Sequence, residues 1–163
     1  MSTTSPVRDK SKLRQMASFW LRRGQLRNHM LVVLASHTAL RVSDLLRLCW
    51  GDVYDFRRQQ FKTHITLREG KTGKTKTIAL HREAVKALKL YFPHRRGVFL
   101  FANNRKSRAA IHRTQAYRIV RRAAEAVGMA QRVSCHSLRK TFGYHAWKSG
   151  YPIVVIMDIY VRP

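Results

Sequence analysis

The chain has 163 residues, 45% of them hydrophobic, which is enough for one domain with a real core and too few for two. Lysine and arginine total 33 against 8 acidic residues, a formal net charge of +25, and a compact domain tolerates such self-repulsion mainly to bind a polyanion, above all nucleic acid. The sequence has no apolar run long enough to span a membrane and no apolar signal core, and its two cysteines suit a reducing compartment such as the cytoplasm.

The first third of the chain has helical periodicity. Residues 1–7 are expected to form a disordered leader, and a single domain is expected over residues 8–163. Apolar residues then recur at spacings of three and four, and Gly24 ends the first such segment. Ser43 or Asp44 would supply a side-chain oxygen to the open N–H groups of the third helix. The pattern predicts helices over residues 8–21, 25–36 and 42–48.

The middle of the chain changes to an alternating pattern. Apolar and polar residues alternate over residues 61–67 and again over 75–80, and the segment between them contains Gly70 and Gly73. Alternation on both sides of a glycine-containing turn predicts an antiparallel hairpin. Helical spacing then resumes over residues 81–91. The expected apolar side of that helix comprises Ala84, Val85, Leu88 and Leu90.

The last third of the chain is helical again. Residues 114–127 predict a helix that buries apolar side chains such as Tyr117 and has one strongly basic face, with Gly128 as its cap. Residues 136–148 and 152–160 predict two further helices. Together these patterns predict a mainly helical α+β domain with a small antiparallel β-hairpin sheet.

A candidate anion site lies at the start of the helix expected over residues 136–148. His136 and Arg139 are three positions apart, so they share a helical face near open N–H groups and the positive end of the helix dipole. Far upstream, Arg41 begins another amphipathic segment between apolar neighbours, and a partly buried guanidinium needs an anion. The hypothesis is that these arginines and the histidine together grip one phosphodiester.

Three segments carry a resemblance to a known family. They are residues 38–46, which contain Ala-Leu-Arg-Val-Ser-Asp, residues 70–74, Gly-Lys-Thr-Gly-Lys, and residues 136–142, His-Ser-Leu-Arg-Lys-Thr-Phe. In order and separation they resemble the catalytic domain of the tyrosine recombinases, the phage-integrase family. Each fragment alone is weak, but the combination spans residues 38–150 and is specific. The resemblance implies a recombinase catalytic fold that breaks and rejoins double-stranded DNA in site-specific recombination or integration.

The resemblance also implies roles for five residues. Arg41 and Arg139 would hold the non-bridging oxygens of the scissile phosphate and stabilise its pentacoordinate transition state. Lys71 would protonate the departing 5′ oxygen, and His136 would hydrogen-bond the phosphate and help to move protons. Asp44 would orient Arg41. Because the arginines replace the cation in such chemistry, neither a metal nor another cofactor is expected.

The family's nucleophile is a tyrosine that follows a second histidine or a tryptophan and forms a covalent 3′-phosphotyrosyl link. That segment would fall near residues 160–162, where Tyr160 stands too early to serve. The expectation is a C-terminally truncated or degenerate recombinase domain that binds DNA but cleaves negligibly alone, because a positioned attacking group supplies much of the rate. A monomer is expected in isolation, with other recombinase protomers as partners on DNA.

Other basic side chains are expected to follow the DNA backbone: Lys74, Arg113, Arg118, Arg121 and Arg122. The competing hypothesis is a non-enzymatic basic nucleic-acid-binding protein, which would place the helix over 42–48 or 114–127 in a groove. Its plainest form is a ribosomal-type protein whose charge only neutralises RNA.

Two further motif interpretations are disfavoured. Residues 70–75 contain Gly-Lys-Thr twice, but the glycine that a nucleotide-binding P-loop needs five positions earlier is missing, and a strand follows instead of a helix. Cys49, Cys135 and His136 lack the paired spacing of zinc ligands, so both thiols are expected in the core or at a site edge. The tryptophans are expected to be packing residues: Trp20, Trp50 and Trp147.

Overall fold

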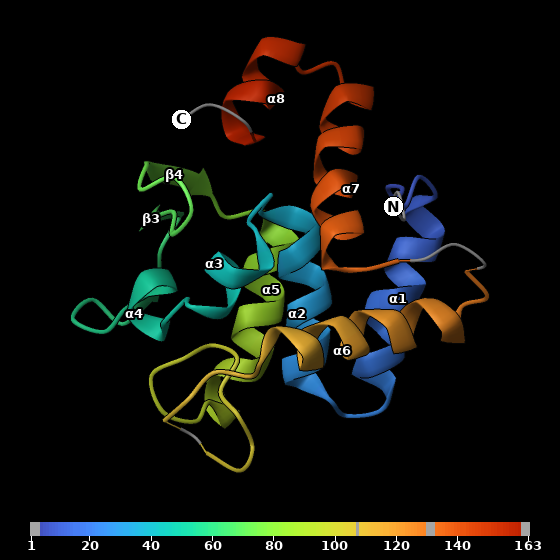
Figure 1. Ribbon diagram of the computed structural model, residues 1–163. Coiled ribbons are helices and arrows are strands. Elements are labelled where there is room, and N and C mark those ends of the chain that lie inside the picture. The colour runs from blue at the N-terminus through green and yellow to red at the C-terminus, as the bar shows by residue number, and fades with distance from the viewer. Residues whose placement is uncertain (1–3, 107, 130–132, 161–163) are drawn as a thin grey trace.

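The computed structural model describes residues 4–106, 108–129 and 133–160, with side chains up to residue 156, and has the predicted mainly helical α+β architecture (Figure 1). Its longer helices are α1 (Lys10–Arg22), α2 (Leu26–His37), α5 (Arg82–Tyr91), α6 (Arg113–Ala126) and α7 (Cys135–Lys148). Helix α2 is buried at every position from Arg27 to Ser36 and contacts the other four. The core is therefore helical, and α2 is its centre.

The remaining elements are short, and most of those labelled lie to one side of α2, whereas the last helix lies above α7 (Figure 1). Within the described residues, no helix combines the length and apolarity that crossing a bilayer requires. The strands form two separate antiparallel pairs, β1 with β2 and β3 with β4. The short elements are α3 (Val42–Leu46), α4 (Trp50–Val53), β1 (Tyr54–Asp55), β2 (Gln60–Phe61), β3 (His64–Arg68), β4 (Thr75–Ala79), a 3-10 helix (Phe92–His94) and α8 (Ile153–Tyr160).

The predicted hairpin is β3–β4. Ile65 lies directly opposite Ile78, and both are buried, so this pair fixes which face of the hairpin meets the core. Gly73 in the turn has a φ of +68°, a conformation that glycine adopts without steric cost. The strand begins at His64 and not at Phe61, because Phe61 pairs with β1 instead. The small β1–β2 pair was absent from the sequence prediction.

Helix α3 is shorter than predicted and ends at Leu46. An antiparallel bridge joins Cys49 to Phe99, and the carbonyl of Leu48 accepts a hydrogen bond from the Leu100 N–H at 3.0 Å. Pairing with a segment 50 residues downstream therefore uses the backbone groups that a longer helix would need. The predicted capping of this helix by Ser43 or Asp44 is also wrong, because α3 has no side-chain cap.

Three apolar side chains predicted to pack are exposed instead. Leu90 is 40% exposed and Tyr117 is 44% exposed. The neighbouring positions are buried instead, Tyr91 on α5 and Ala116 on α6. Trp147 is 53% exposed in the last turn of α7, beyond Thr141, the last buried residue of that helix. The other tryptophans are buried, as predicted: Trp20 and Trp50.

The described part of the expected leader lies against α7. Val7 is 1% exposed, and its N–H donates to the hydroxyl of Thr141 at 2.8 Å. The ring of His145 hydrogen-bonds the Val7 carbonyl at 3.0 Å, and Lys140 donates to the carbonyl of Thr4 at 2.7 Å. One buried apolar side chain and three hydrogen bonds hold this segment in place.

Candidate active site

Helix α7 begins at Cys135, so His136 and Arg139 of the His-x-x-Arg motif lie in its first two turns. The hydroxyl of Ser134 accepts from the Ser137 N–H at 3.4 Å, and the hydroxyl of Ser137 accepts from the Ser134 N–H at 3.1 Å. This reciprocal cap fixes the first turn of the helix. His136 lies exposed in that turn, and Arg139, one turn later on the same face, is 9% exposed.

Arg139 is anchored to the loop that carries Arg41. Its Nε donates to the carbonyl oxygen of Ala39 at 2.8 Å, across 100 residues of sequence. Ala39 is fully buried and has a φ of +57°, a left-handed conformation that is uncommon for a residue other than glycine. This conformation turns the chain from the end of α2 to Arg41, the N-cap of α3. The fold therefore brings the two predicted arginines into neighbouring positions.

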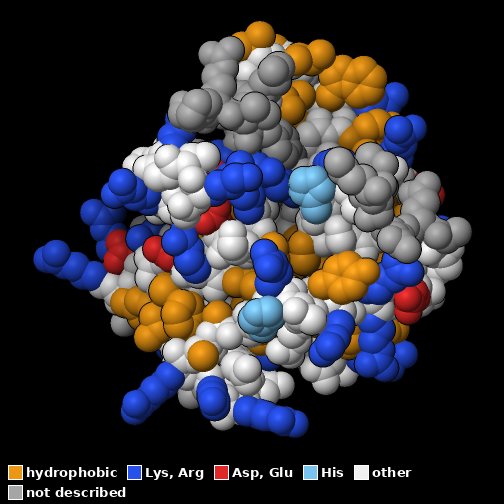
Figure 2. Space-filling model, in the orientation of Figure 1, with side chains coloured by type: hydrophobic (Ala, Val, Ile, Leu, Met, Phe, Trp, Pro, Cys, Tyr) orange, Lys and Arg blue, Asp and Glu red, His pale blue; other side chains and the backbone are white. Residues whose placement is uncertain are grey.

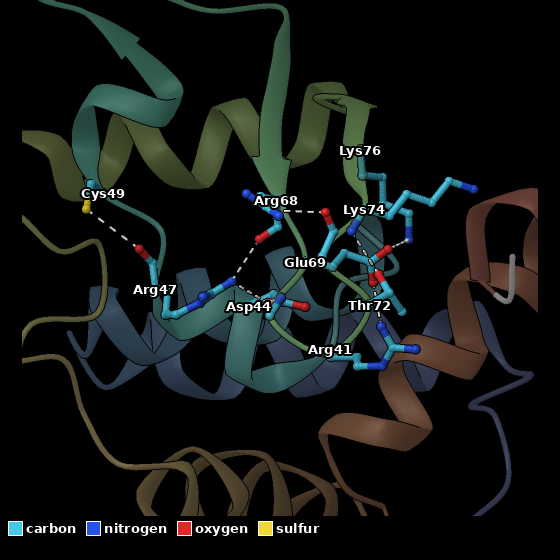
Figure 3. A network of polar contacts seen from close by, with 11 residues as sticks. Arg41, Asp44, Arg47, Cys49, Arg68, Glu69, Thr72, Lys74 and Lys76 are labelled. Atoms are coloured by element: carbon cyan, nitrogen blue, oxygen red, sulfur yellow. Dashed lines mark hydrogen bonds and ion pairs between the residues drawn. The ribbon is translucent and has the colours of Figure 1, made fainter. Parts of the chain in front are cut away.

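The side chain of Arg41 is bound by a carboxylate that was not predicted. Its Nη1 lies 2.5 Å from Oε2 of Glu69, and the other oxygen of Glu69 lies 3.7 Å from Nζ of Lys76 (Figure 3). The Glu69 side chain is only 6% exposed and that of Arg41 is 25% exposed. Glu69 follows the last residue of β3, so the end of the hairpin delivers it to Arg41.

Asp44 fastens the hairpin turn to α3. Its buried Oδ1 accepts from the Gly70 N–H at 3.1 Å and from Nη2 of Arg47 at 2.7 Å (Figure 3). Arg47 also donates to the carbonyl of Arg68 at 3.0 Å. In the described part of the chain, the hydrogen bonds of Asp44 go to these groups and not to the guanidinium of Arg41, so the predicted orienting role has no direct contact behind it.

The lysines of the hairpin have different surroundings. Lys71 is exposed in the turn and Lys74 is half-buried. Lys76, which was not among the predicted site residues, has a side chain only 12% exposed. A signal for it was present in the sequence, because strand side chains alternate and position 76 shares a face with the buried Ile78.

The pKa of Lys76 shows which charges surround its ammonium group. Burial lowers this pKa, and the carboxylate of Glu69 raises it. The positive charges of Arg139 and Arg41 lower it further, and Asp44 raises it. Arg41 and Arg139 therefore lie close enough to Lys76 for their charges to act on it, and we call Arg41, Lys76 and Arg139 the cation cluster.

His136 has a pKa lowered by partial burial and, in addition, by the positive charges of Lys140 and Arg139. A lowered pKa keeps the imidazole neutral at pH 7, where one ring nitrogen donates and the other accepts a hydrogen bond. The ring is therefore suited to hydrogen bonding and proton transfer more than to adding a fixed positive charge.

The arginines predicted to follow a backbone lie on α6. Arg113, Arg118 and Arg122 are exposed, whereas Arg121 is half-buried and its Nε lies 2.9 Å from Oε1 of Glu125. Figure 2 shows Lys and Arg side chains over much of the displayed face, with few acidic groups between them. The excess positive charge is therefore spread widely and extends well beyond the cation cluster.

The segment expected to precede the family's nucleophile lies largely outside the described residues. Helix α8 includes Tyr160 in its backbone, but neither the Tyr160 side chain nor residues 161–163 are described. The described part of the chain therefore supplies the candidate phosphate-binding groups, and no role follows from it for this tyrosine.

Both cysteines are free thiols, and Cys135 is buried at the start of α7. Among the described residues, no three His, Cys, Asp or Glu side chains are grouped as metal ligands would be. Burial raises the pKa of the Cys135 thiol to about 11. Burial also raises the pKa of Cys49, with a further contribution from the carboxylate of Asp52.

We predict slow alkylation of Cys135 in the folded protein. At pH 8 only about one thiol in a thousand is ionised at a pKa of about 11, and the thiolate is the reactive species. Iodoacetamide at pH 8 followed by peptide mass spectrometry should show little label at Cys135 until denaturant is added. Labelling of native Cys135 as fast as that of the denatured chain would contradict this environment.

Comparison with known proteins covers nearly the whole chain. Residues 8–160 match the model of the phage integrase family. A probable integrase/recombinase, YoeC of Bacillus subtilis (strain 168), is 34% identical over 160 residues, covering 98% of this chain and 83% of that protein. Tyrosine recombinase XerD of Mycobacterium leprae (strain TN) is 32% identical over 146 residues, covering 82% of this chain but 44% of that protein.

Solved structures share the fold. The crystal structure of XerA recombinase has a TM-score of 0.80 at 24% identity, over 98% of this chain and 57% of that one. XerH recombinase bound to its difH substrate gives a TM-score of 0.77 at 17% identity, over 98% and 48%. A lambda integrase dimer bound to a COC′ core site gives 0.73 at 18% identity, over 99% and 57%. The chain thus spans about half the length of these proteins, and by its family match and its relatives it belongs to the phage integrase family of tyrosine recombinases.

Proposed function

We propose that the cation cluster binds one backbone phosphate of duplex DNA and that the domain serves DNA breakage and rejoining in site-specific recombination. The observation that carries this proposal is the hydrogen bond from Arg139 to Ala39, because it ties Arg139 to the loop that carries Arg41, and the charges of both arginines act on Lys76. XerH and lambda integrase, which share the fold, were solved on DNA substrates. The net charge of +25 supports the same partner.

In this proposal Arg41 and Arg139 bind the non-bridging oxygens of the scissile phosphate. A guanidinium stays charged at every relevant pH, and its parallel N–H groups match two oxygens of one phosphate. When the tyrosine oxygen bonds to phosphorus, negative charge grows on these oxygens, so both arginines bind the transition state more tightly than the ground state. This chemistry needs mainly fixed positive charge, which Arg139 on α7 and Arg41 at the N-terminus of α3 supply.

Two further groups complete the proposed reaction. The bond from phosphorus to the 5′ oxygen breaks as the phosphotyrosyl bond forms, and the departing oxygen takes a proton from Lys71, which lies exposed on the hairpin turn. His136, kept neutral by its lowered pKa, hydrogen-bonds the phosphate. The nucleophilic tyrosine is assigned to no described residue. In this proposal the proton donor and the two arginines come from separate elements of the fold and contact the same phosphate group of the bound DNA.

The exposed basic side chains of α6 extend the proposed DNA contact beyond one phosphate. Arg113, Arg118 and Arg122 present charge to solvent, as does Lys71 on the hairpin. Each phosphate that they neutralise releases condensed counterions from DNA, so affinity falls steeply with salt. These contacts position the duplex without reading its sequence.

We predict that Arg41→Ala weakens binding to a short duplex by roughly tenfold at low salt and lowers the log–log salt slope by about one unit, since it removes one phosphate contact. Arg57→Ala is the matched control, because Arg57 is exposed in the β1–β2 turn and its loss removes the same charge. It should weaken binding only about twofold. Fluorescence anisotropy over a salt series measures both quantities.

Equal losses of duplex affinity for the Arg41 and Arg57 variants would contradict a phosphate pocket. They would indicate that DNA binds to a generally basic surface. A log–log plot that stays flat with salt would contradict phosphate binding altogether.

A further inference from the structure

A buried carboxylate lies where the proposed function requires an anion. Glu69 is 5% exposed and touches two members of the cation cluster, Arg41 at 2.5 Å and Lys76 at 3.7 Å. Asp44, the other buried acid nearby, is held by Arg47 and the Gly70 N–H instead. Glu69 is therefore the acid that forms ion pairs with both Arg41 and Lys76 in the described part of the chain.

Lys76 makes this arrangement unusual. It lies directly opposite Leu67 in the hairpin and on the same face as Ile78, a position where a strand normally carries an apolar side chain. Burying an ammonium group is costly unless an anion lies close to it. The positive charges of Arg41 and Arg139 add repulsion. A lysine at this position is explained if the site is built to receive an anion.

We propose that Glu69 is a built-in counter-anion occupying the place of the DNA phosphate, and that the phosphate displaces it and takes Lys76 as a third cationic contact beside Arg41 and Arg139. This inference rests on the proposed function. A carboxylate and a phosphate edge present two oxygens to a guanidinium in the same way, so the two anions compete for the same N–H groups of Arg41.

The exchange has a physical consequence for DNA binding. Without bound DNA, Glu69 keeps the buried cations from repelling one another. With DNA bound, the ion pairs of Glu69 must break before the phosphate can enter, so part of the binding free energy is used to release the carboxylate. Removing the negative charge of Glu69 should then strengthen binding by more than its effect on net charge.

The test is Glu69→Gln, with Glu125→Gln as the matched control. Glu125 is exposed on α6 and forms an ion pair with Arg121. Its substitution by glutamine therefore changes the net charge by the same amount, but at a position exposed to solvent. Duplex affinity, measured by fluorescence anisotropy at fixed salt, should rise roughly tenfold for the first variant and about twofold for the second. In an Arg41→Ala background the gain from Glu69→Gln should largely disappear. Equal gains for the two variants, or weaker binding by a folded Glu69→Gln protein, would overturn the proposal.

The proposed contact of Lys76 with the phosphate is tested by a second pair of variants. Lys76→Ala should weaken duplex binding roughly tenfold, and Lys89→Ala, which removes an exposed charge from the last turn of α5, about twofold. Equal losses would remove Lys76 from the phosphate site and overturn its part of the proposal. Circular dichroism establishes that each variant is folded before binding is compared.

Nuclear magnetic resonance on the unaltered chain tests the exchange even if a variant does not fold. With carbon-13 in the glutamate carboxyl groups, the resonance of Glu69 should shift when saturating duplex is added. An unchanged resonance would overturn the exchange. The proposed function fails separately, namely if Arg41→Ala binds duplex as tightly as the unaltered protein does. If Arg41→Ala weakens binding and Glu69→Gln changes nothing beyond its control, only this inference fails.

Discussion

Arg139→Ala is expected to lower the affinity for duplex DNA by roughly a hundredfold, a larger loss than that expected for Arg41→Ala or Lys76→Ala. The variant removes a proposed phosphate contact and also leaves the buried carbonyl of Ala39 without its donor at 2.8 Å. Because that carbonyl precedes Arg41 by two residues, the loop that positions the second arginine loosens as well. One substitution therefore disturbs both guanidinium groups.

Arg139→Lys separates charge from geometry. Lysine keeps the positive charge but lacks the planar fork that serves Ala39 and the phosphate together, so affinity should fall by roughly tenfold instead of recovering. Arg118→Ala on α6 is the control, an exposed arginine whose loss should cost about threefold. If lysine at position 139 bound duplex as well as arginine, fixed geometry at this residue would be unnecessary and the proposed pocket would be wrong.

Local sequence signals predicted the elements that depend on local physics. Helices α1, α2, α5, α6 and α7 follow from apolar spacing and end within a few residues of the predicted positions, and the glycine turn gives β3–β4. Gly24 and Gly128 have positive φ where the helix ends were predicted. The predicted length of α3 was wrong because a distant segment competes for its backbone: the carbonyl of Leu48 accepts from the N–H of Leu100.

In the candidate site, too, local sequence patterns predicted some residues, whereas others depend on contacts between distant segments. Arg41 and Arg139 were selected from a family resemblance and one helical spacing, and the fold links them through Ala39. Glu69 was not selected, because its meeting with Arg41 depends on where the hairpin docks, which no local pattern encodes. Lys76 had a local signal, a charged residue in the core-facing register of a strand, and that signal has meaning only once the pairing of Ile65 with Ile78 is known.

Leu138→Ala is expected to destabilise the domain by about 3 kcal/mol, because it leaves a cavity in a core that cannot fully close around it. Leu138 is fully buried on α7, between His136 and Arg139, so the helix that presents the candidate site also forms part of the core. Leu90→Ala is the control, since Leu90 is 40% exposed on α5 and should lose less than about 1 kcal/mol. Urea unfolding followed by circular dichroism measures both.

The Leu138 variant also tests whether stability and site geometry can be separated. In low denaturant, where most molecules remain folded, duplex affinity should fall by no more than about threefold, because the Ser134 cap and the Arg139 bond to Ala39 still place the motif. A loss as large as that of Arg139→Ala would show that core packing around α7 sets the position of the guanidinium. A free-energy change no larger than that of Leu90→Ala would contradict the burial of Leu138 itself, and with it the packing of α7 against α2 that holds the site together.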